Sequence, residues 1–460
     1  MSTADFKSLP LKPAMLKNLS RMGFSEMTPI QAQSLPAVLA GKDVIGRAKT
    51  GSGKTVAFGL GIMHRLEVKR FRVQSLVLCP TRELADQVAK VLRQLARFTH
   101  NVKVLTLCGG MPFGPQLGSL EHGAHIVVGT PGRIQEHLRK GTLKLDDLNT
   151  LVLDEADRML DMGFADAMRD VVSYIQGPHQ TLLFSATYPA EIARISAEFQ
   201  RDPLEVTVES HHSHAHIEQY LYPVKRDGRT ELLIRLLKHY QPGSAVVFCN
   251  TKKVCQEVAD ALCEEGFYAA AIHGDLEQKY RDQVLVKFAN RSSTILVATD
   301  VAARGLDIED LAAVINYEVS RDPEVHVHRI GRTGRAGQQG LALSLISEKE
   351  QYKVEAIEDY QRSPLTWAEP EQLIDKADSV PRPTMATVMI DGGKKQKLRA
   401  GDILGALTKD AGLQGKDIGK IDIFDFCAYV AVRRPVARQA VNYLRNGKIK
   451  GRAFKARQLR

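Results

Sequence analysis

Two groups of residues, about a hundred positions apart, carry side chains suited to phosphate chemistry. The first is the segment Ala48–Thr55, which reads AKTGSGKT, and the second is Asp154–Asp157, which reads DEAD. Glycines let backbone N–H groups approach phosphate oxygens, and carboxylates can hold a metal ion or activate water. Together the two groups predict a chain that binds and hydrolyses a nucleoside triphosphate.

Each chemical group in these segments has an expected role. Lys54 should reach the β and γ phosphates, and the Thr55 hydroxyl should ligate Mg²⁺. Asp154 should hold Mg²⁺ through water, and Glu155 should polarise the attacking water. The strict pattern G-x-x-x-x-G-K-[ST] fails at Ala48, so a glycine-rich turn without nucleotide is an alternative for the loop alone. The pair Asp154-Glu155 after an apolar run argues against it.

Two long regions of the chain share one sequence pattern, and this pattern predicts the elements that must position these groups. Short apolar runs alternate with segments of helical period, which indicates an α/β fold with parallel sheets covered on both faces. Ligands bind at the carboxyl ends of such strands, where both motifs lie. The runs are 76–79, 126–129, 151–154 and 182–184 in the first region, and 245–248, 295–298 and 313–316 in the second.

Composition shifts mark the boundaries between the predicted parts. The expected domains are 1–208, 219–368 and 384–460, joined by linkers at 209–218 and 369–383. The first linker holds four histidines, at positions 211, 212, 214 and 216. A metal site is one interpretation, but the segment lacks cysteine, and a solvated polar linker is favoured.

The last 77 residues account for the whole net positive charge of the chain. From Thr384 to Arg460 there are 17 basic and 6 acidic residues, a net charge of +11, whereas the preceding residues have a net charge of −1. This asymmetry predicts a polyanion-binding appendage. Its pattern predicts a βαββαβ order, with strands at 387–390, 418–423, 426–432 and 453–458 and helices at 400–409 and 435–444.

The composition favours a cytoplasmic protein. The N-terminus lacks the features of a signal peptide. The sequence contains no run of 18 apolar residues, so no membrane span is expected. The six cysteines contain no C-x-x-C pair, so buried reduced thiols are expected rather than a zinc site.

An arginine-rich turn in the second region offers charge for phosphoryl transfer. The segment His328–Gly337 reads HRIGRTGRAG. Guanidinium groups suit the charge that develops on a transferring phosphoryl group. Arg332 and Arg335 are the candidates, although such a turn taken alone is usually a solvated loop.

These motifs resemble the DEAD-box ATP-dependent RNA helicases, over about residues 6–364, and Ala48 is that family's own variant of the loop. The resemblance implies two tandem RecA-like domains that close over ATP and RNA. It also implies that Gln31 reads adenine, and that Phe6 and Phe24 lie near the base. The rest of the implied nucleotide site comprises Ala48, Lys49, Thr50, Gly51, Ser52, Gly53, Lys54, Thr55, Gly305 and Asp307, with Arg332 and Arg335 as arginine fingers.

The same resemblance implies coupling and RNA-binding residues. Ser185, Ala186 and Thr187 would couple hydrolysis to domain closure. Contacts to phosphates and 2′-hydroxyls would favour RNA and carry little sequence information. The implied contacts are Pro80, Thr81, Arg82, Gly109, Gly110, Thr130, Pro131, Gly132 and Arg133 in the first domain, and Gln278, Arg281, Thr299 and Asp300 in the second.

The C-terminal appendage resembles an RNA-recognition motif with an altered binding face. Tyr429 stands at one expected stacking position, but Met389, Cys427 and Val432 stand where aromatics are usual, so binding by basic loops is expected. The candidate contacts are Lys394, Lys395, Lys397, Tyr429, Lys448 and Lys450. Phrases such as Ile390–Lys395 and Gly447–Gly451 resemble the bacterial DbpA-type helicases, which implies a 23S rRNA hairpin and a role in assembly of the large ribosomal subunit.

The expected activity is therefore RNA-stimulated ATP hydrolysis that locally unwinds short duplexes, by a monomer with no membrane partner. An ATP-gated RNA clamp or assembly scaffold with little unwinding is the alternative, because clamping needs closure but no turnover. A DNA helicase is a weaker rival, which Asp157 and the RNA-type appendage argue against.

Overall fold

The computed structural model describes residues 5–48, 51–208, 217–303, 311–334, 339–374 and 380–459. The chain divides into two compact units, Met1–His211 and His212–Arg460. The first unit holds a parallel sheet, and the second holds another parallel sheet and an antiparallel one. This confirms the predicted fold class. The predicted histidine linker, 209–218, lies outside the described residues except for its last two positions.

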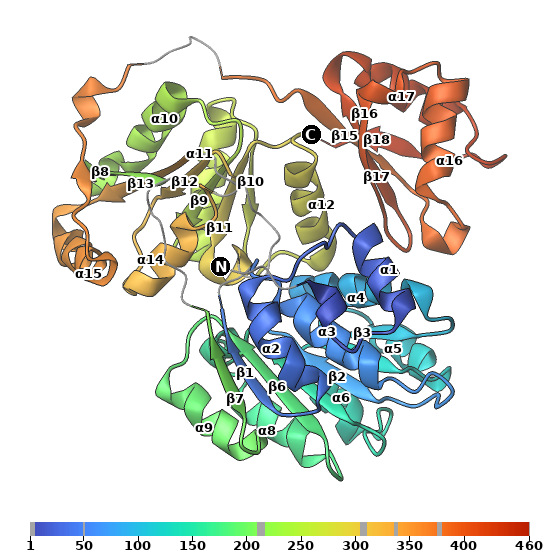
Figure 1. The fold of residues 1–460 in the computed structure, drawn as a ribbon. Helices are drawn as coiled ribbons and strands as arrows, with labels where there is room; N and C mark the ends of the chain where they lie inside the picture. The colour runs from blue at the N-terminus through green and yellow to red at the C-terminus, as the bar shows by residue number, and fades with distance from the viewer. Residues whose placement is uncertain are drawn as a thin grey trace. The chain divides into compact units, whose positions relative to one another are not determined.

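The sheet of the first unit has the order β3-β4-β2-β5-β6-β1-β7, and its strands pair in parallel (Figure 1). Parallel strands need crossover connections, which the intervening helices supply. The strands are β1 Val44–Arg47, β2 Ser75–Leu78, β3 Val104–Leu107, β4 Ile126–Gly129, β5 Thr150–Asp154, β6 Gln180–Ser185 and β7 Leu204–Thr207. The helices are α1 Pro13–Arg21, α2 Pro29–Leu39, α3 Lys54–Arg65, α4 Arg82–Leu95, α5 Phe113–Glu121, α6 Pro131–Arg139, α7 Ala156–Asp161, α8 Ala165–Ser173 and α9 Ala190–Phe199.

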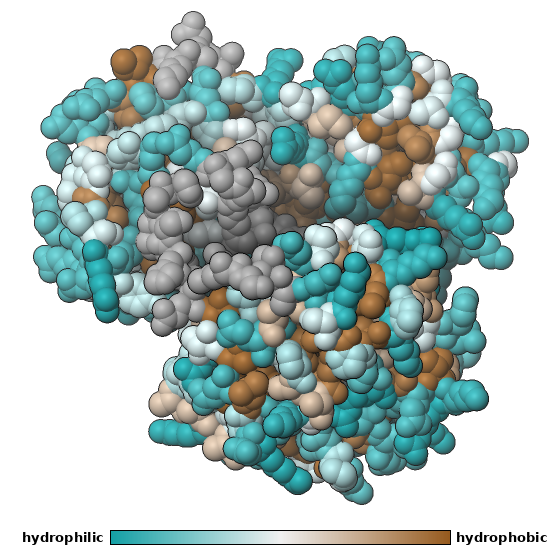
Figure 2. All heavy atoms as spheres, viewed as in Figure 1, coloured by the Kyte–Doolittle hydropathy of each residue, from teal (hydrophilic) through white to brown (hydrophobic). Residues whose placement is uncertain are grey.

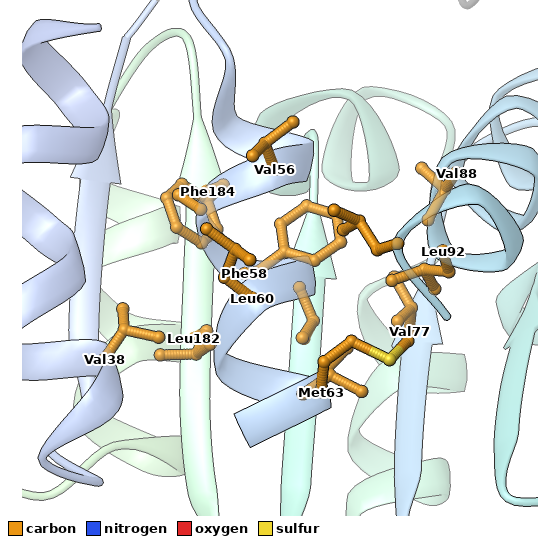
Figure 3. Packing of buried hydrophobic residues seen from close by; sticks show 14 of the residues in the cluster. Val38, Val56, Phe58, Leu60, Met63, Val77, Val88, Leu92, Leu182 and Phe184 are labelled. Carbon is orange, nitrogen blue, oxygen red and sulfur yellow. The ribbon is translucent and has the colours of Figure 1, made fainter. Parts of the chain in front are cut away.

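Alternate residues of each strand in this sheet face opposite helical layers, because successive side chains in a strand point to opposite faces. Val77, Val152 and Leu182 pack with residues of α2, α3 and α4. Figure 3 shows Val77 and Leu182 beside α3. Leu76, Leu151 and their neighbours pack with α6, α8 and α9 on the other face. The strands are therefore buried on both faces, and their carboxyl ends are held rigidly.

The second unit repeats this architecture, with the strand order β10-β11-β9-β12-β13-β8-β14. One face packs with α10 and α11, and the other packs with α12 and α13. The strands are β8 Ile217–Pro223, β9 Ala245–Cys249, β10 Ala269–Ile272, β11 Ile295–Thr299, β12 Ala313–Asn316, β13 Gly340–Ile346 and β14 Thr366–Trp367. The helices are α10 Arg229–Tyr240, α11 Lys252–Glu264, α12 Gln278–Ala289, α13 Asp300–Ala303, α14 Pro323–Ile330 and α15 Gln351–Gln361.

The C-terminal module, residues 384–459, forms an antiparallel sheet of order β16-β17-β15-β18. Val388 and Val430 face the two helices of the module, where they join Ile403 and Leu444 in its core. Its elements, in chain order, are β15 Met385–Ile390, α16 Ala400–Gly405, β16 Ile418–Ile423, β17 Ala428–Arg433, α17 Arg434–Asn446 and β18 Ala456–Gln458.

The predicted strands and helices are found with small shifts in their ends. The helix expected to end at Lys409 is α-helical to Gly405 and then continues as a π-helix, Ala406–Asp410. The strand expected from Phe426 begins at Ala428, because the exposed Phe426 lies in the connection from β16.

Hydrophilic side chains cover much of the described surface that is visible in Figure 2. Within the described ranges, no helix has the length and apolar character that crossing a membrane would need.

Candidate functional site

The loop between β1 and α3 takes a conformation that depends on glycine. Gly51 and Gly53 have φ of 80° and 92°, in the left-handed region that glycine adopts without strain. A Cβ added at Gly53 would lie 2.4 Å from Nε2 of Gln31. The loop therefore needs glycine both for its backbone and for the close approach of Gln31. Lys49 and Thr50 lie outside the described residues.

Lys54 is buried at the start of α3, where its Nζ donates a hydrogen bond to the carbonyl oxygen of Ala48 at 2.5 Å. Burial lowers the pKa of the Lys54 ammonium, and the charges of Asp154 and Glu155 oppose that shift. Two features of the loop suit a bound phosphate. The hydroxyl of Ser52 is buried without a hydrogen-bond partner, and Thr55 lies in the first turn of α3, where N–H groups favour anions.

The two candidate carboxylates lie at the carboxyl end of β5. Asp154 and Glu155 are 3% and 5% exposed. Burial raises the pKa of Asp154, and the neighbouring charge of Glu155 raises it further. Glu155 has a left-handed backbone, with φ of 53°, and its Oε2 accepts a hydrogen bond from Nη1 of Arg158 at 2.6 Å. Arg158 therefore fixes the Glu155 carboxylate. Arg158 was not among the predicted site residues, although it lies three positions after Glu155, the residue that precedes α7, and this spacing could have indicated the pair.

The last carboxylate of the DEAD segment binds the chain after β6. Oδ2 of Asp157 accepts hydrogen bonds from the N–H groups of Ala186 and Thr187, at 3.2 and 2.9 Å, and from the Thr187 hydroxyl at 3.0 Å. The N–H of Asp157 donates to the Ser185 hydroxyl at 3.3 Å. The three predicted coupling residues thus all lie beside this carboxylate segment.

Gln31 joins the segment before β1 to the phosphate loop. Its Oε1 accepts from the N–H of Thr28 at 2.9 Å, and its Nε2 donates to the carbonyl oxygen of Gly53 at 3.0 Å. Phe24 packs half-buried on the core, and Phe6 is 3% exposed within it. Their expected contacts with a nucleotide base stay predictions.

The site as a whole fits a triphosphate with a divalent cation. The orphaned Ser52 hydroxyl, the left-handed glycines and the buried ammonium of Lys54 suit phosphate oxygens. Asp154 and the Thr55 hydroxyl supply the hard oxygen ligands that Mg²⁺ prefers.

The predicted RNA contacts of the first unit gather at the carboxyl ends of β2, β3 and β4. Pro80, Thr81 and Arg82 follow β2, Gly109 and Gly110 follow β3, and Thr130, Pro131, Gly132 and Arg133 follow β4. The N–H of Gly109 donates to the Thr130 hydroxyl at 3.3 Å. Nη1 of Arg133 donates to the carbonyl oxygen of Met111 and to Oε1 of Gln116, at 2.9 and 3.0 Å. The structure therefore places these residues along one edge of the sheet.

Of the predicted RNA contacts of the second unit, two lie at the carboxyl end of β11 and two lie at the start of α12. Thr299 ends β11, Asp300 begins α13, and Gln278 and Arg281 lie in the first turn of α12. Arg329, which is 2% exposed, donates from Nε and Nη2 to the two oxygens of Asp300, each at 2.7 Å. Arg329 was not among the predicted site residues, and its contacts identify it as the residue that positions Asp300. Arg332 is 9% exposed, while Gly305, Asp307 and Arg335 lie outside the described residues.

The candidate lysines of the C-terminal module are exposed on its connections. Lys394, Lys395 and Lys397 lie between β15 and α16, and Lys448 and Lys450 lie between α17 and β18. Exposed ammonium groups on short turns suit phosphate contacts. Their role in RNA binding stays a prediction.

Tyr429 lies in a different environment from these lysines. It is 1% exposed and packs with Met389 of β15 and Val286 of α12. On the same sheet face, the Thr387 hydroxyl bonds the Ser292 hydroxyl at 2.7 Å and accepts from Nδ2 of Asn290 at 3.2 Å. The face that carries the expected stacking position is thus covered by α12 and the turn after it. A base could stack on Tyr429 only if this contact opened.

Comparison with known proteins agrees with this geometry. The DEAD/DEAH box helicase family matches residues 28–195, the helicase conserved C-terminal domain matches 228–337, and the DbpA RNA binding domain matches 387–458. The chain is 56% identical to the ATP-dependent RNA helicase DbpA of Escherichia coli over 98% of both chains. It is 44% identical to the DEAD-box ATP-dependent RNA helicase CshA of Bacillus subtilis, over 77% of this chain and 72% of that one.

A solved structure shows the same fold at lower identity. The structure of S. cerevisiae Dbp5 bound to RNA and ADP BeF3 has a TM-score of 0.72 and 28% identity, over 80% of this chain and 96% of that one. The two carboxylates behind a glycine-dependent phosphate loop, the second parallel-sheet domain and the C-terminal module all agree with these matches. The chain is therefore a DEAD-box ATP-dependent RNA helicase of the DbpA subfamily.

Proposed function

We propose that this helicase unwinds short RNA duplexes locally and is directed to them by its C-terminal module, which binds a hairpin of 23S rRNA during assembly of the large ribosomal subunit. The observation that supports this most is the module itself. It matches the DbpA RNA binding domain over residues 387–458, and it holds the whole net positive charge of the chain. A tethered module raises the effective concentration of duplexes near its target.

The proposed catalytic roles rest on the geometry at β5 and α3. Lys54 binds phosphate, Glu155 accepts a proton from the attacking water, and Arg158 keeps the Glu155 carboxylate in place. Mg²⁺, held through Asp154 and the Thr55 hydroxyl, would neutralise charge on the phosphates. Arg332 and Arg335 would stabilise the charge that develops as the phosphoryl group leaves. We further propose that the protein acts as a monomer in the cytoplasm.

The test is the ATPase rate of the full chain with a panel of ribosomal RNA fragments at a fixed, stated salt concentration. One 23S hairpin fragment should stimulate hydrolysis more than equal amounts of the others. Deleting residues 384–460 should keep basal hydrolysis and abolish this selectivity. Because the deletion also uncovers α12, the pair Lys448→Glu and Lys450→Glu in the full chain provides a second variant. Unchanged selectivity in both variants would contradict the proposal.

A strand-displacement assay separates unwinding from clamping. A duplex placed beside the preferred hairpin should separate only when ATP is present. If ATP increased RNA retention without separating the strands, the clamp alternative would replace unwinding.

A further inference from the structure

A groove of about 680 Å³ lies where the start of α12 meets the edge strand β18 of the C-terminal module. Its volume falls within the range of about 300–1,000 Å³ that is typical of ligand sites. The polar and aromatic residues in its lining are Lys279, Asp391, Arg445, Phe454, Lys455 and Arg457. The groove is thus built jointly by the second RecA-like domain and the module.

The charge of the groove is strongly unbalanced. Four of these side chains are cationic, and Asp391 is the single acid among them. Lys279, Lys455 and Arg457 are exposed, and none of the four cations forms an ion pair within the described ranges of the chain. Nε of Arg445 donates to the carbonyl oxygen of Ala456 at 2.8 Å, which anchors its guanidinium beside β18. Such a surface suits a polyanion.

An aromatic ring in the groove is held in a fixed position. Phe454 is half-buried, and a Cβ built at Gly392 would come within 2.3 Å of its ring. Only glycine therefore allows the ring to lie directly on the backbone at position 392. A rigid, partly exposed ring beside cationic groups is the arrangement on which unpaired nucleic-acid bases stack.

The position of the groove indicates which part of an RNA would reach it. Lys279 follows Gln278 directly and precedes Arg281 by two residues on α12, and the latter two are predicted RNA contacts of the second domain. The groove is therefore adjacent to the expected path of the strand on that domain. The packing of α12 on Met389 and Tyr429 covers this face of the module's sheet. An RNA strand that leaves the module on this side would therefore pass along the β18 edge.

We infer that this groove binds single-stranded RNA, through phosphate contacts to Lys279, Lys455 and Arg457 and stacking on Phe454, where the strand leaves the structured RNA held by the module. The inference rests on the proposed function, because it assumes that the module holds a structured RNA. An acidic protein segment is the other kind of ligand that such charge could attract, but it would gain nothing from the fixed ring.

The experiment uses the full chain and two fluorescein-labelled RNAs, a 23S rRNA hairpin with blunt ends and the same hairpin with single-stranded extensions. Affinities are measured over a range of salt concentrations without nucleotide. The parent chain should bind the extended RNA more tightly. The pair Lys279→Glu and Lys455→Glu should remove that gain, about tenfold, and should lower the salt slope for the extended RNA by about two, one for each lost phosphate contact. Binding of the blunt hairpin should change little.

The matched control is the pair Lys253→Glu and Lys409→Glu, which makes the same charge change on exposed residues of α11 and of the π-helix after α16.

Phe454→Leu separates stacking from charge, because it should weaken binding of the extended RNA without changing the salt slope. Thermal unfolding of each variant checks that it is folded, and Lys279→Gln with Lys455→Gln gives a milder change at the same positions.

Three results would overturn the inference. The first is a groove variant that binds the extended RNA as the control variant does. The second is an equal loss of affinity for blunt and extended RNA, which would show that the groove does not contact the extension. The third is a parent chain that gains nothing from the extension. Failure of the proposed function is distinct, since it would appear as equal binding of ribosomal and unrelated hairpins by the parent chain.

Discussion

Thr187 donates two hydrogen bonds to the same carboxylate oxygen of Asp157, one from its N–H at 2.9 Å and one from its hydroxyl at 3.0 Å. The two residues follow the neighbouring strands β6 and β5. These bonds tie the chain after β6 directly to the segment that carries Asp154 and Glu155. This contact is the physical basis for the proposed coupling of hydrolysis to RNA unwinding.

Replacing Thr187 tests this coupling. Thr187→Val keeps the shape and the backbone N–H but removes a hydroxyl bond to a charged acceptor, a contact worth about 1.5–3 kcal/mol. We expect nucleotide affinity and basal hydrolysis to stay within about threefold of the parent, while strand displacement falls by at least about tenfold, the factor that 1.4 kcal/mol represents. Thr207→Val on the exposed end of β7 is the control. Equal loss of basal hydrolysis and unwinding would contradict a coupling role.

Arg158 should act on catalysis through Glu155. Arg158→Met keeps much of the aliphatic length but removes the 2.6 Å hydrogen bond that fixes the Glu155 carboxylate. We expect ATP affinity to be retained and the maximal hydrolysis rate to fall by about tenfold, less than for loss of the carboxylate itself, which costs about 10²–10⁴-fold. Steady-state kinetics measure this split. Arg139→Met, which removes an exposed ion pair with Asp170, should leave the rate unchanged.

His137 should make the stability of the first unit depend on pH. Burial, with a further contribution from Arg133, lowers the pKa of His137 to about 4. Because the folded state binds this proton less readily than the unfolded state, the stability from His137 is complete above its ordinary pKa of about 6.5 and is lost as pH falls from there toward 4. The expected loss at pH 5 is on the order of 1 kcal/mol.

Hydrogen exchange of the α6 amides, corrected for the intrinsic effect of pH, measures this change locally. Protection should fall between pH 7 and pH 5 in the parent and much less in His137→Gln. An equal fall in both chains would show that other groups cause the pH dependence.

Tyr429 should contribute to stability rather than to RNA affinity. Its ring is buried against Met389 and Val286, so Tyr429→Leu should lower the unfolding temperature of the second unit, since aromatic truncation in a core costs about 3–5 kcal/mol at the extreme. Hairpin affinity of the folded variant should stay within about twofold, a difference of about 0.4 kcal/mol. A loss of affinity without a loss of stability would instead support base stacking on Tyr429.

In β15 and β17, the side chains on one sheet face could be predicted from the sequence, whereas the partner of the other face could not. Val388 and Val430 were expected in strands and do face the helices of the module, because a period of two is a local property. The covering of Met389 and Tyr429 on the opposite face comes from α12, which precedes them by about 100 and 140 residues in the chain, and no local pattern encodes such a partner. Phosphate-loop and carboxylate motifs were recognisable for the opposite reason, since their chemistry lies in consecutive residues.

The two positioning arginines illustrate both cases, a contact that the local sequence indicates and a contact that only the fold reveals. Arg158 lies in α7, three residues after Glu155, which directly precedes that helix, so its spacing carried a signal. Arg329 reaches Asp300 from α14, 29 positions away, and its contact depends on the arrangement of elements in the second sheet. Motif positions could name Asp300 as a candidate, but only the fold identified the group that holds it.

Glu155 is the residue proposed to activate water for RNA-stimulated hydrolysis, and the whole proposed mechanism depends on it. The measurement is the single-turnover rate of ATP hydrolysis by Glu155→Gln, with saturating RNA, together with the affinity of the variant for ATP. We predict unchanged affinity and a rate lower by at least about a hundredfold. Hydrolysis at the rate of the parent chain would show that Glu155 does not activate the attacking water.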